Sequence, residues 1–565
     1  MSVSTRPIGE WLLLTALVLI VALLSLAPLA RLLLESIAPG GEWSTTALAE
    51  VLGDPLTWRA TGRSLFTALG GTLIALALGC TFALLVALTD LRGKPFLVFG
   101  FLLPLMIPPQ ITALAWTQLF GPSSVLLRTL GLAPPLGTPN PLYSPGGIIL
   151  LLGIQHGPLV FLALRAGLRS LPRELVEGAR ASGARPFRVL ATVVLPLMTP
   201  PLVAGTALAF VSCIGNFGIP ALLGIPANYT VLPTLIYRRL AGFGPAVIAE
   251  VAVLSVLVGL IAVVGVLAQG WVLGRRDYRI IGPPAQPLAL SLGRWRGAVE
   301  ALCWLLIVLI LVLPLTALVS TSLVSAYGVA LGPDTLTLDN YVEVLLRQSV
   351  TVRAFRNSLL LAGGAALALA LLAGPLGYFL VWHRNRLLAG LNLLAELPYA
   401  LPGVVLAIAC ILLFLRPLPV LGVSLYGTVW IIFVAYLARF LTLALRPAIG
   451  GFHQLDRSLE EAARSCGAGF AKRLRSVVLP PVVPLLGAGA ILVFLTAVNE
   501  LTVSALLWSS GSETLGVVVF NLDDGGYTVL AAAVAVLTVI LILVLMLLGS
   551  WLSRYLPPGA LPWEA

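Results

Sequence analysis

Apolar runs of about 20 residues recur along the chain and constrain its fold more than any other feature. Each run is long enough to cross the roughly 30 Å hydrocarbon core of a bilayer as one helix. Only 10% of the 565 residues are charged, whereas soluble domains carry roughly 25%. In lipid the backbone must satisfy its own hydrogen bonds, which a helix does within one segment. The sequence therefore predicts an all-α polytopic membrane protein.

We predict about 12 transmembrane helices from run length and from the positions of helix breakers. In the first half the runs lie at about residues 10–33, 64–89, 96–119, 146–168, 197–223 and 246–273. In the second half they lie at about residues 298–322, 357–382, 388–415, 425–447, 481–508 and 527–552. The first run is longer than the apolar segment of a signal peptide, so we expect it to be a retained helix.

One polar segment occurs twice between these runs. The chain reads E-G-A-R-A-S-G from Glu177 and E-A-A-R-S-C-G from Glu461, and in each copy nine residues separate the glycine from V-V-L-P. The two copies lie 284 residues apart. A lone polar loop is often a solvated connector, but two loops with one internal spacing indicate a duplicated protein with two equivalent functional loops.

The duplication extends into the apolar runs. Pro104 and Pro108 match Pro398 and Pro402 at an offset of 294 residues, and Ser64 matches Ser358 at the same offset. The change from 294 to 284 places a deletion of ten residues in the second copy, and the loop near residues 121–144 is where we expect it. An even number of spans in each copy gives two parallel six-helix repeats. We expect repeats at 1–273 and 298–565, joined by a proline-rich cytoplasmic linker at 274–297.

The distribution of positive charge gives the orientation. The net charge of +11 could indicate nucleic-acid binding, but the Lys and Arg residues gather in short loops on one side, as the positive-inside rule requires. A cytoplasmic N-terminus places both glutamate loops in the cytoplasm as well. The five cysteines show no metal-ligand spacing, and we expect no metal and no cofactor in this chain.

The residue types of the two loops suit a docking element. The residues around Glu177 and Glu461 favour short helices. Gly183 and Gly467 can adopt a positive φ and turn the chain after each helix. Pro196 and Pro480 suit the first turn of the following membrane helix, where no backbone donor is needed.

The pattern E-A-A, three residues, G, nine residues and then L-P resembles the cytoplasmic loop of binding-protein-dependent ABC importer permeases. The resemblance covers essentially the whole chain and implies the type I importer permease fold, with one fused chain in place of two permease subunits. It also implies two separate ABC ATPase subunits that dock on the loops and bind the ATP, a solute-binding protein outside, and a bacterial cytoplasmic (inner) membrane. Gly178 departs from the family's usual Ala. The residues to which the resemblance assigns coupling are Glu177, Gly178, Ala179, Gly183, Leu195, Pro196, Glu461, Ala462, Ala463, Gly467, Leu479 and Pro480. The chain itself has no phosphate-binding G-x-x-x-x-G-K-[ST] segment.

Polar residues and prolines at membrane depth are candidates for the translocation path, because both are costly in lipid unless protein or water covers them. The candidates are Pro104, Pro398, Asn216, Glu396, Asn499 and Glu500. A packing kink is the alternative for the prolines, and a structural role near the outer surface is the alternative for Asn216 and Glu500. We interpret His156 as a hydrogen-bonded core residue, and we expect Arg439 to be the partner of Glu396.

The solute is less constrained than the class. The fused form and the segments 215–240 and 499–515 are similar to ferric-iron permeases, while importers of thiamine, phosphonate, polyamine or sulfate share much of this text. An ion-coupled secondary transporter is an alternative of another class; a membrane-embedded enzyme is not favoured, because the spans hold no HExxH, paired aspartates or Ser–His pair. Four arginines in the outer loops are expected to contact the binding protein: Arg238, Arg239, Arg347 and Arg353.

Overall fold

The computed structural model describes residues 8–242, 246–274, 291–383, 385–417 and 422–555. Over these residues the chain is helical and contains no strand, and Val324 and Leu336 form an isolated bridge. Most of the predicted linker at 274–297 lies outside the described residues. The predicted all-α fold is confirmed.

The described part of the chain holds nine helices that are long and apolar enough to cross a membrane, and three further pairs of helices that do so together across a bend. The total is up to 12 spans, as predicted. The bent pairs occupy residues 94–119, 187–214 and 386–414, with bends of 101°, 67° and 108°. The protein is thus a multi-pass membrane protein in which some spans are broken.

The first half runs from α1 to α15. Its helices are α1 (Ile8–Val21), α2 (Ala27–Ile37), α3 (Thr46–Gly53), α4 (Pro55–Leu88), α5 (Lys94–Met106), α6 (Pro109–Leu119), α7 (Val125–Thr129), α8 (Pro145–Arg169), α9 (Arg173–Ala181), α10 (Pro186–Val189), α11 (Leu195–Leu197), α12 (Thr199–Ile214), α13 (Gly218–Gly224), α14 (Leu232–Leu240) and α15 (Val247–Leu273).

The second half runs from α16 to α28. Its helices are α16 (Arg296–Ile307), α17 (Leu313–Ser322), α18 (Asp339–Val342), α19 (Ser349–Trp382), α20 (Arg386–Ala400), α21 (Gly403–Phe414), α22 (Val429–Gln454), α23 (Ser458–Ser465), α24 (Phe470–Arg473), α25 (Val483–Val498), α26 (Ser504–Leu507), α27 (Leu515–Asp524) and α28 (Thr528–Leu552).

Helix boundaries repeat at the offsets found in the sequence. Helices α4 and α19 have 34 residues each and begin 294 residues apart, while α12 and α25 have 16 residues each and begin 284 apart. The offset changes between α6 and α8, where the connection at 120–144 is longer than its counterpart at 415–428. The prediction of a shortened loop in the second copy is confirmed.

Wide helical turns precede four prolines. In each case the residue before the proline donates its N–H to the carbonyl five residues earlier instead of four, and the widened turns are 22–26, 190–194, 308–312 and 474–478. The prolines that follow are Pro28, Pro196, Pro314 and Pro480. Because proline has no N–H and its ring crowds the preceding turn, a local widening accommodates it without ending the helix. Each half therefore has a widened turn near its start and another after its polar loop.

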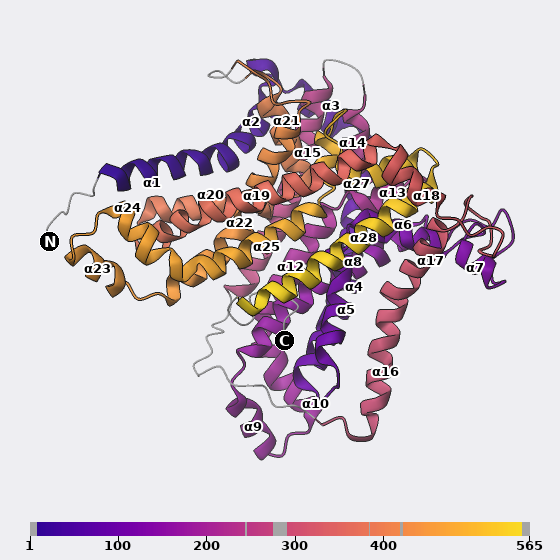
Figure 1. The fold of residues 1–565 in the computed structure, drawn as a ribbon, viewed down its shortest axis with the longest axis horizontal. Coiled ribbons are helices and arrows are strands. Elements are labelled where there is room, and N and C mark those ends of the chain that lie inside the picture. The colour runs from indigo at the N-terminus through magenta and orange to yellow at the C-terminus, as the bar shows by residue number, and fades with distance from the viewer. Residues whose placement is uncertain (1–7, 243–245, 275–290, 384, 418–421, 556–565) are drawn as a thin grey trace.

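Each half extends its first helices across the other half. Helix α2 packs against α21, and α1 contacts α19, α20 and α24. In the reciprocal arrangement α17 packs against α6 and α16 contacts α5. The crossing arms therefore join the halves into one body (Figure 1).

Polar contacts hold both arms in place. Arg296, the first residue of α16, lies 3.7 Å from Asp90, and the Arg92 N–H donates to Glu300 over 2.8 Å. The Leu292 N–H donates to Asp90 over 3.0 Å and holds the pKa of that carboxyl below its usual range. On the other arm, Glu10 of α1 lies 3.2 Å from His383.

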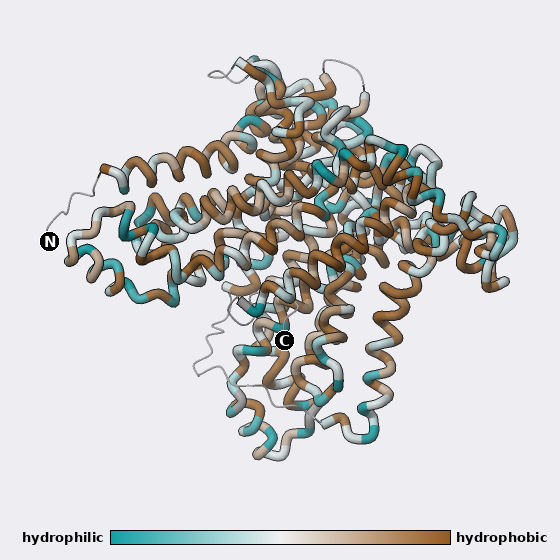
Figure 2. Tube along the Cα trace, viewed as in Figure 1, coloured by the Kyte–Doolittle hydropathy of each residue, from teal (hydrophilic) through white to brown (hydrophobic). Residues whose placement is uncertain are grey.

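The molecule has two diverging legs (Figure 1). One leg ends at α23 and α24, the other ends at α9 and α10, and the legs meet around α6, α13 and α27. We call the tips of the legs the loop end and the region where they meet the far end. Hydrophilic residues gather at both tips and at the far end, while the helices between them are mostly hydrophobic (Figure 2).

Candidate coupling loops and translocation path

The two glutamate loops have the same backbone structure. In the first, the N–H of Gly183 donates to the Arg180 carbonyl and the N–H of Ala184 donates to the Ala179 carbonyl. In the second, Gly467 and Ala468 make the equivalent bonds to Arg464 and Ala463. This is a Schellman ending, which needs a left-handed residue after the helix. Gly183 and Gly467 supply it with φ of 81° and 78°, which confirms the predicted turns.

The first residues of the motif are exposed on both short helices. Glu177 and Gly178 in α9 are exposed, and so are Glu461 and Ala462 in α23. In the part of the chain that the structure describes, no atom from outside the helix backbone lies within 4 Å of a Cβ built on Gly178, so a flat surface can approach closely there. These motif residues of both loops are thus accessible from outside the described part of the chain.

The motif ends where the next membrane helices begin. Pro196 is exposed in α11 and Pro480 is exposed in the turn 480–482, and partly buried Leu195 and Leu479 precede them. The helices α12 and α25 follow within three residues. Any movement of either loop therefore reaches a membrane helix through one wide turn and a proline.

The proline pairs of the path prediction coincide with sharp bends. Pro104 and Pro108 flank the 101° bend between α5 and α6, and Pro398 and Pro402 flank the 108° bend between α20 and α21. Helices α6 and α21 are almost entirely buried inside the protein, as broken helices in a membrane must be.

Gln155 satisfies the carbonyls that the first bend releases. Its carboxamide nitrogen donates to the carbonyls of Pro104 (2.8 Å) and Ile107 (3.0 Å), and its oxygen accepts from Thr112 Oγ1 (3.0 Å). Sequence reasoning missed this residue, although a Gln inside an apolar run was the available signal. In the second half the position belongs to Arg439, 284 residues later.

Asn216 and Glu500 are both buried and both start a short helix. The Asn216 side chain accepts from the Ile219 N–H (3.1 Å), and the Glu500 carboxylate accepts from the N–H groups of Val503 (2.9 Å) and Ser504 (3.2 Å). These bonds cap the chain where α12 and α25 end and α13 and α26 begin. Their contacts therefore agree with the alternative interpretation, a structural role near the outer surface. That Asn216 and Glu500 line the translocation path stays a prediction.

The predicted pair of Arg439 with Glu396 is wrong. Arg439 Nε lies 3.8 Å from Glu500, and Glu396 lies 4.0 Å from Arg446 instead. Arg439 and Arg446 are seven residues apart on α22 and so lie on one face, two turns apart. Asn499, the remaining candidate, donates to the Leu495 carbonyl over 2.9 Å. His156 is buried and its Nδ1 donates to the Leu152 carbonyl over 2.9 Å, which confirms it as a hydrogen-bonded core histidine.

The two halves meet at the far end through close contacts. The Phe217 ring lies 5.7 Å from Phe520 of the other half. A Cβ on Gly215 would lie 2.7 Å from Pro402, and a Cβ on Gly516 would lie 2.9 Å from Gln110. Glycine at these two positions lets a backbone of one half approach Pro402 or the Gln110 side chain of the other half closely. The body is closed at this end.

The four outer-loop arginines differ in their engagement. Arg239 pairs with Asp54 (2.7 Å) and Glu250 (3.0 Å), and Arg353 pairs with Glu513 (2.9 Å). Arg238 is exposed, with one bond to Thr230, and the Arg347 side chain is 68% exposed beside Glu343.

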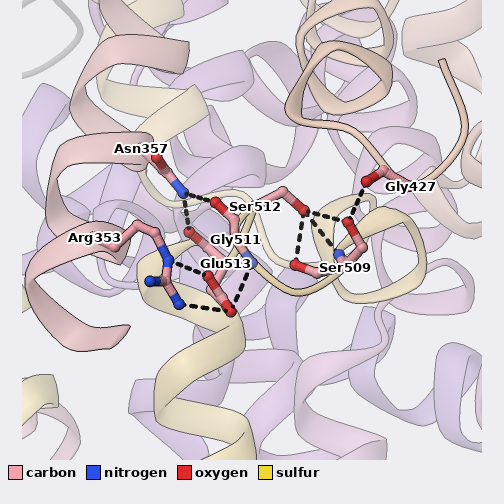
Figure 3. Close-up of polar contacts among 7 residues, drawn as sticks. All are labelled: Arg353, Asn357, Gly427, Ser509, Gly511, Ser512 and Glu513. Atoms are coloured by element: carbon pink, nitrogen blue, oxygen red, sulfur yellow. Dashed lines mark hydrogen bonds and ion pairs between the residues drawn. The ribbon is translucent and has the colours of Figure 1, made fainter. Parts of the chain in front are cut away.

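Figure 3 shows how the loop before α27 is held at the far end. Arg353 binds the Glu513 carboxylate with two bonds of 2.9 and 3.1 Å, and Asn357 donates to the Gly511 and Glu513 carbonyls (Figure 3). Glu513 is nearly buried, which raises the pKa of its carboxyl, but the Arg353 and Gly511 donors outweigh burial and bring that pKa below its usual range.

Two parallel repeats of broken membrane helices, closed at one end and carrying twin polar loops at the other, define a transport permease. Residues 75–273 and 366–561 both match the family described as binding-protein-dependent transport system inner membrane component. The chain belongs to this family and is an ABC importer permease with two copies of the family domain.

Individual relatives are consistent with this membership. The probable ABC transporter permease protein y4fN of Sinorhizobium fredii is 28% identical over 436 residues, which cover 76% of this chain and 75% of y4fN. The ferric transport system permease protein FbpB of Actinobacillus pleuropneumoniae is 25% identical over 548 residues, which cover 94% of this chain and 77% of that protein. The molybdenum transport system permease protein ModB of Escherichia coli is 29% identical over 224 residues, 38% of this chain and 92% of ModB.

Proposed function

We propose that this chain is the membrane subunit of an ATP-driven importer and that separate ABC ATPase subunits, two in number, dock on α9 and α23. The observation that carries the proposal is the identity of the two loops: the same helix, the same Schellman ending and the same wide turn before a proline, one at the tip of each leg. A passive body needs two such levers if a pair of motors is to move its halves against each other.

The translocation path runs between the two halves. The contacts at the far end and the diverging legs correspond to an arrangement open toward the loop end (Figure 1). Approach of the two ATPases on ATP binding would bring α9 and α23 together and separate Phe217 from Phe520. The proline bends and the polar residues Glu396, Asn499 and Glu500 lie along this route.

We place the loop end and the N-terminus in the cytoplasm and the far end outside the bacterial inner membrane, following the positive-inside rule. A solute-binding protein would then dock at the far end. Arg238 and Arg347 are the stronger candidates for that contact because both are exposed, and Arg347 pairs with Glu343, which lies just one turn earlier in the chain. Arg239 and Arg353 are partly buried against carboxylates of other elements.

Ferric iron is the solute we propose. The support is the resemblance to relatives named as ferric transport permeases, which extends over 94% and 91% of this chain in two cases. Importers of molybdenum and 2-aminoethylphosphonate share only parts of the chain. Permeases for thiamine, phosphonate, polyamine or sulfate remain the alternatives of the same class.

Native Cys466 allows a direct test of loop position and docking. It is exposed at the end of α23, while Cys213, Cys303 and Cys410 are buried and Cys80 is partly buried. In a Cys80→Ser background, a membrane-impermeant maleimide should label Cys466 in inside-out vesicles but not in right-side-out vesicles. Ser182→Cys, made with Cys466→Ser, places the reporter at the equivalent position of α9 and should give the same result. Added ATPase should protect both.

Substitution of the motif glutamates tests the coupling itself. Glu177→Ala together with Glu461→Ala should abolish co-purification of the ATPase and lower solute uptake more than ten-fold, while Glu42→Ala at the far end should keep the ATPase bound. Labelling of positions 182 and 466 from opposite faces, or intact docking in the double variant, would overturn the proposal. Uptake driven by an ion gradient in ATP-depleted vesicles would favour a secondary transporter.

The solute is tested in proteoliposomes that contain the chain, its ATPase and its binding protein. ATP-dependent accumulation of radioactive ferric iron, with no accumulation of molybdate or phosphonate, is the expected result. Accumulation of an oxyanion without iron would support the importer function and contradict ferric iron as the solute.

A further inference from the structure

The second coupling loop is anchored to the membrane body by a buried polar cluster. Glu460 in α23 accepts a hydrogen bond of 2.8 Å from the Tyr378 hydroxyl of α19 and lies 3.3 Å from Arg473 Nε of α24. Glu460 is 9% exposed and Arg473 is 8% exposed. Arg473 also donates to the Ala468 carbonyl over 3.0 Å, next to the Gly467 turn. One carboxylate thus joins the docking helix, the turn after it and a membrane helix.

The first coupling loop has apolar residues at the same three positions. At the offsets of 284 and 294 residues, Glu460 corresponds to Val176, Arg473 to Val189 and Tyr378 to Leu84. Val176 is 6% exposed and Val189 is 1% exposed, and Leu84 packs against the same hydrophobic core. All three polar side chains of the second loop's anchor thus have apolar counterparts in the first loop.

The two kinds of anchor resist movement differently. Apolar contact is non-directional, so a helix on an apolar seat can slide or rotate with little loss of free energy. Hydrogen bonds and ion pairs require distance and angle, and a buried pair that loses its partner leaves an uncompensated charge. The α23 seat is therefore stiff, whereas the α9 seat is compliant.

The first helix of the chain also packs against the anchor of the second coupling loop. Helix α1 contacts α24, and a Cβ built on Gly9 would lie 4.0 Å from the Phe470 ring. Glu10 lies 3.2 Å from His383 at the end of α19. The His383 ring lies 5.0 Å from the Tyr378 ring. The arm of the first half thus braces the anchor of the second loop.

We propose that Glu460, Arg473 and Tyr378 are positioning residues that clamp the second coupling loop to α19, so that the two loops transmit ATPase movement unequally. The second loop moves α19 and the second half as a rigid unit, and the first loop adjusts to the ATPase surface. This inference rests on the proposed coupling function, but the stiffness of the loops can be measured without any ATPase.

Spin labels compare the two loops in the isolated chain. In a Cys80→Ser background, a nitroxide on Cys466 should be at least two-fold less mobile than one on Ser182→Cys made with Cys466→Ser. The triple variant Glu460→Val, Arg473→Val and Tyr378→Leu, which copies the first loop, should raise the mobility at Cys466 to that at position 182. Equal mobility in the starting chain, or no change in the triple variant, would overturn the clamp whether or not the chain proves to be coupled to an ATPase.

Transport separates positioning from simple packing. Single Glu460→Val or Arg473→Val variants leave one buried charge unpaired and should accumulate poorly in the membrane. The triple variant removes both charges and should recover membrane amount and unfolding temperature, yet it should move about ten-fold less solute per ATP hydrolysed. A triple variant with a normal ratio of solute to ATP would reduce the cluster to a space-filling role and reject the proposal.

Discussion

At the scale of residues, the repeats keep a position and change its chemistry. Glu513 of the second half corresponds to Tyr229 of the first. Tyr229 lies under the Arg63 guanidinium, 4.6 Å from the ring centroid, while Glu513 pairs with Arg353. Both contacts fasten the loop that precedes a far-end helix to the start of a long membrane helix. Both halves therefore have an arginine contact at this position, a cation–π contact in the first half and an ion pair in the second.

This difference predicts that only the second of these contacts depends on pH in the acidic range. The pKa of Glu513 lies below its usual range, so its stabilisation is present above the unfolded pKa and is lost as pH falls through the folded value. Arg353→Ala should therefore lower the unfolding temperature at pH 7, and the difference from the unsubstituted chain should shrink on acidification toward pH 3. Arg63→Ala is the matched control, because its contact with Tyr229 involves no group that titrates in that range. Thermal unfolding in detergent measures both, and a pH-independent Arg353→Ala effect would contradict the ion-pair explanation.

The pKa of Asp523, at the end of α27, is shifted in the opposite direction from that of Glu513. Burial raises the pKa of its carboxyl to about 6, with the neighbouring Asp524 acting in the same direction against a bond from Thr528. A raised carboxyl pKa means that the folded protein loses stability as pH increases from about 4 to about 6 and stays lower above it. Asp523→Asn should therefore increase the unfolding temperature at pH 8 and have little effect at pH 4. A stabilisation that is equal at both values would show that charge is not the cause.

At the scale of elements, the docking helix α9 holds two glycines with opposite expected effects. Gly183 has φ of 81° after the helix, and Gly178 lies within it; neither has an atom within 4 Å of a built Cβ. Substitution to Ala is therefore decided by backbone preference alone. In the second loop only the turn glycine has a counterpart, Gly467 after α23 with φ of 78°, because Ala462 occupies the position of Gly178.

Gly183→Ala should weaken α9 by about 1 kcal/mol, because a residue with a Cβ is strained in the left-handed region. Gly178→Ala should strengthen α9 by about 1 kcal/mol, since Ala has the higher helix propensity. Amide hydrogen exchange of residues 174–181 should rise about five-fold in the first variant and fall about five-fold in the second. Gly183→Asn should lie between Gly and Ala, because Asn tolerates the left-handed region. Equal exchange in all variants would mean that α9 is held by its surroundings and not by its ends.

At the scale of the whole molecule, the sequence predicted the features that depend on local order along the chain. Twelve spans, two parallel repeats, the shortened loop and the proline bends follow from run length, spacing and backbone chemistry. Glycine turns were predictable for the same reason. The start of α4 at Pro55, nine residues before the predicted 64, was missed because Asp54 caps a polar first stretch that hydropathy does not report.

Features that depend on contacts between distant elements could not be predicted in this way. Asn216 and Glu500 were singled out as polar residues at membrane depth, but their use as caps depends on a break that apolar composition hides. Arg439 was paired with the wrong glutamate because its neighbour is set by how α22 faces α20 and α25. The crossing arms and the apolar replacement of the Glu460 cluster are visible only when both halves are placed together.

The carboxamide of Gln110 opposes closure of the far end. Gln110 of α6 is fully buried between Gly218 of its own half and Gly516 of the other, and among the described residues neither its carboxamide oxygen nor its nitrogen has a hydrogen-bond partner. The equivalent residue of the second half is Val404, which is also fully buried. An unpaired buried amide costs about 2 kcal/mol, and separation of the halves would return it to water. Gln110 should therefore bias the protein toward opening at this end.

Two substitutions test this bias in opposite directions. Gln110→Leu keeps the volume and removes the unpaired amide, so it should stabilise the closed far end and lower the open population more than ten-fold. Gly516→Ala places a Cβ 2.9 Å from Gln110 and 3.2 Å from Leu501, so it should favour opening. Spin-label distances between residues 217 and 520, each replaced by Cys in a chain without other reactive cysteines, report the two populations in the presence of ATPase and ATP. Because both variants change one contact from opposite sides, a shift in the same direction for both would show that local damage, and not the cost of burying Gln110, determines the equilibrium.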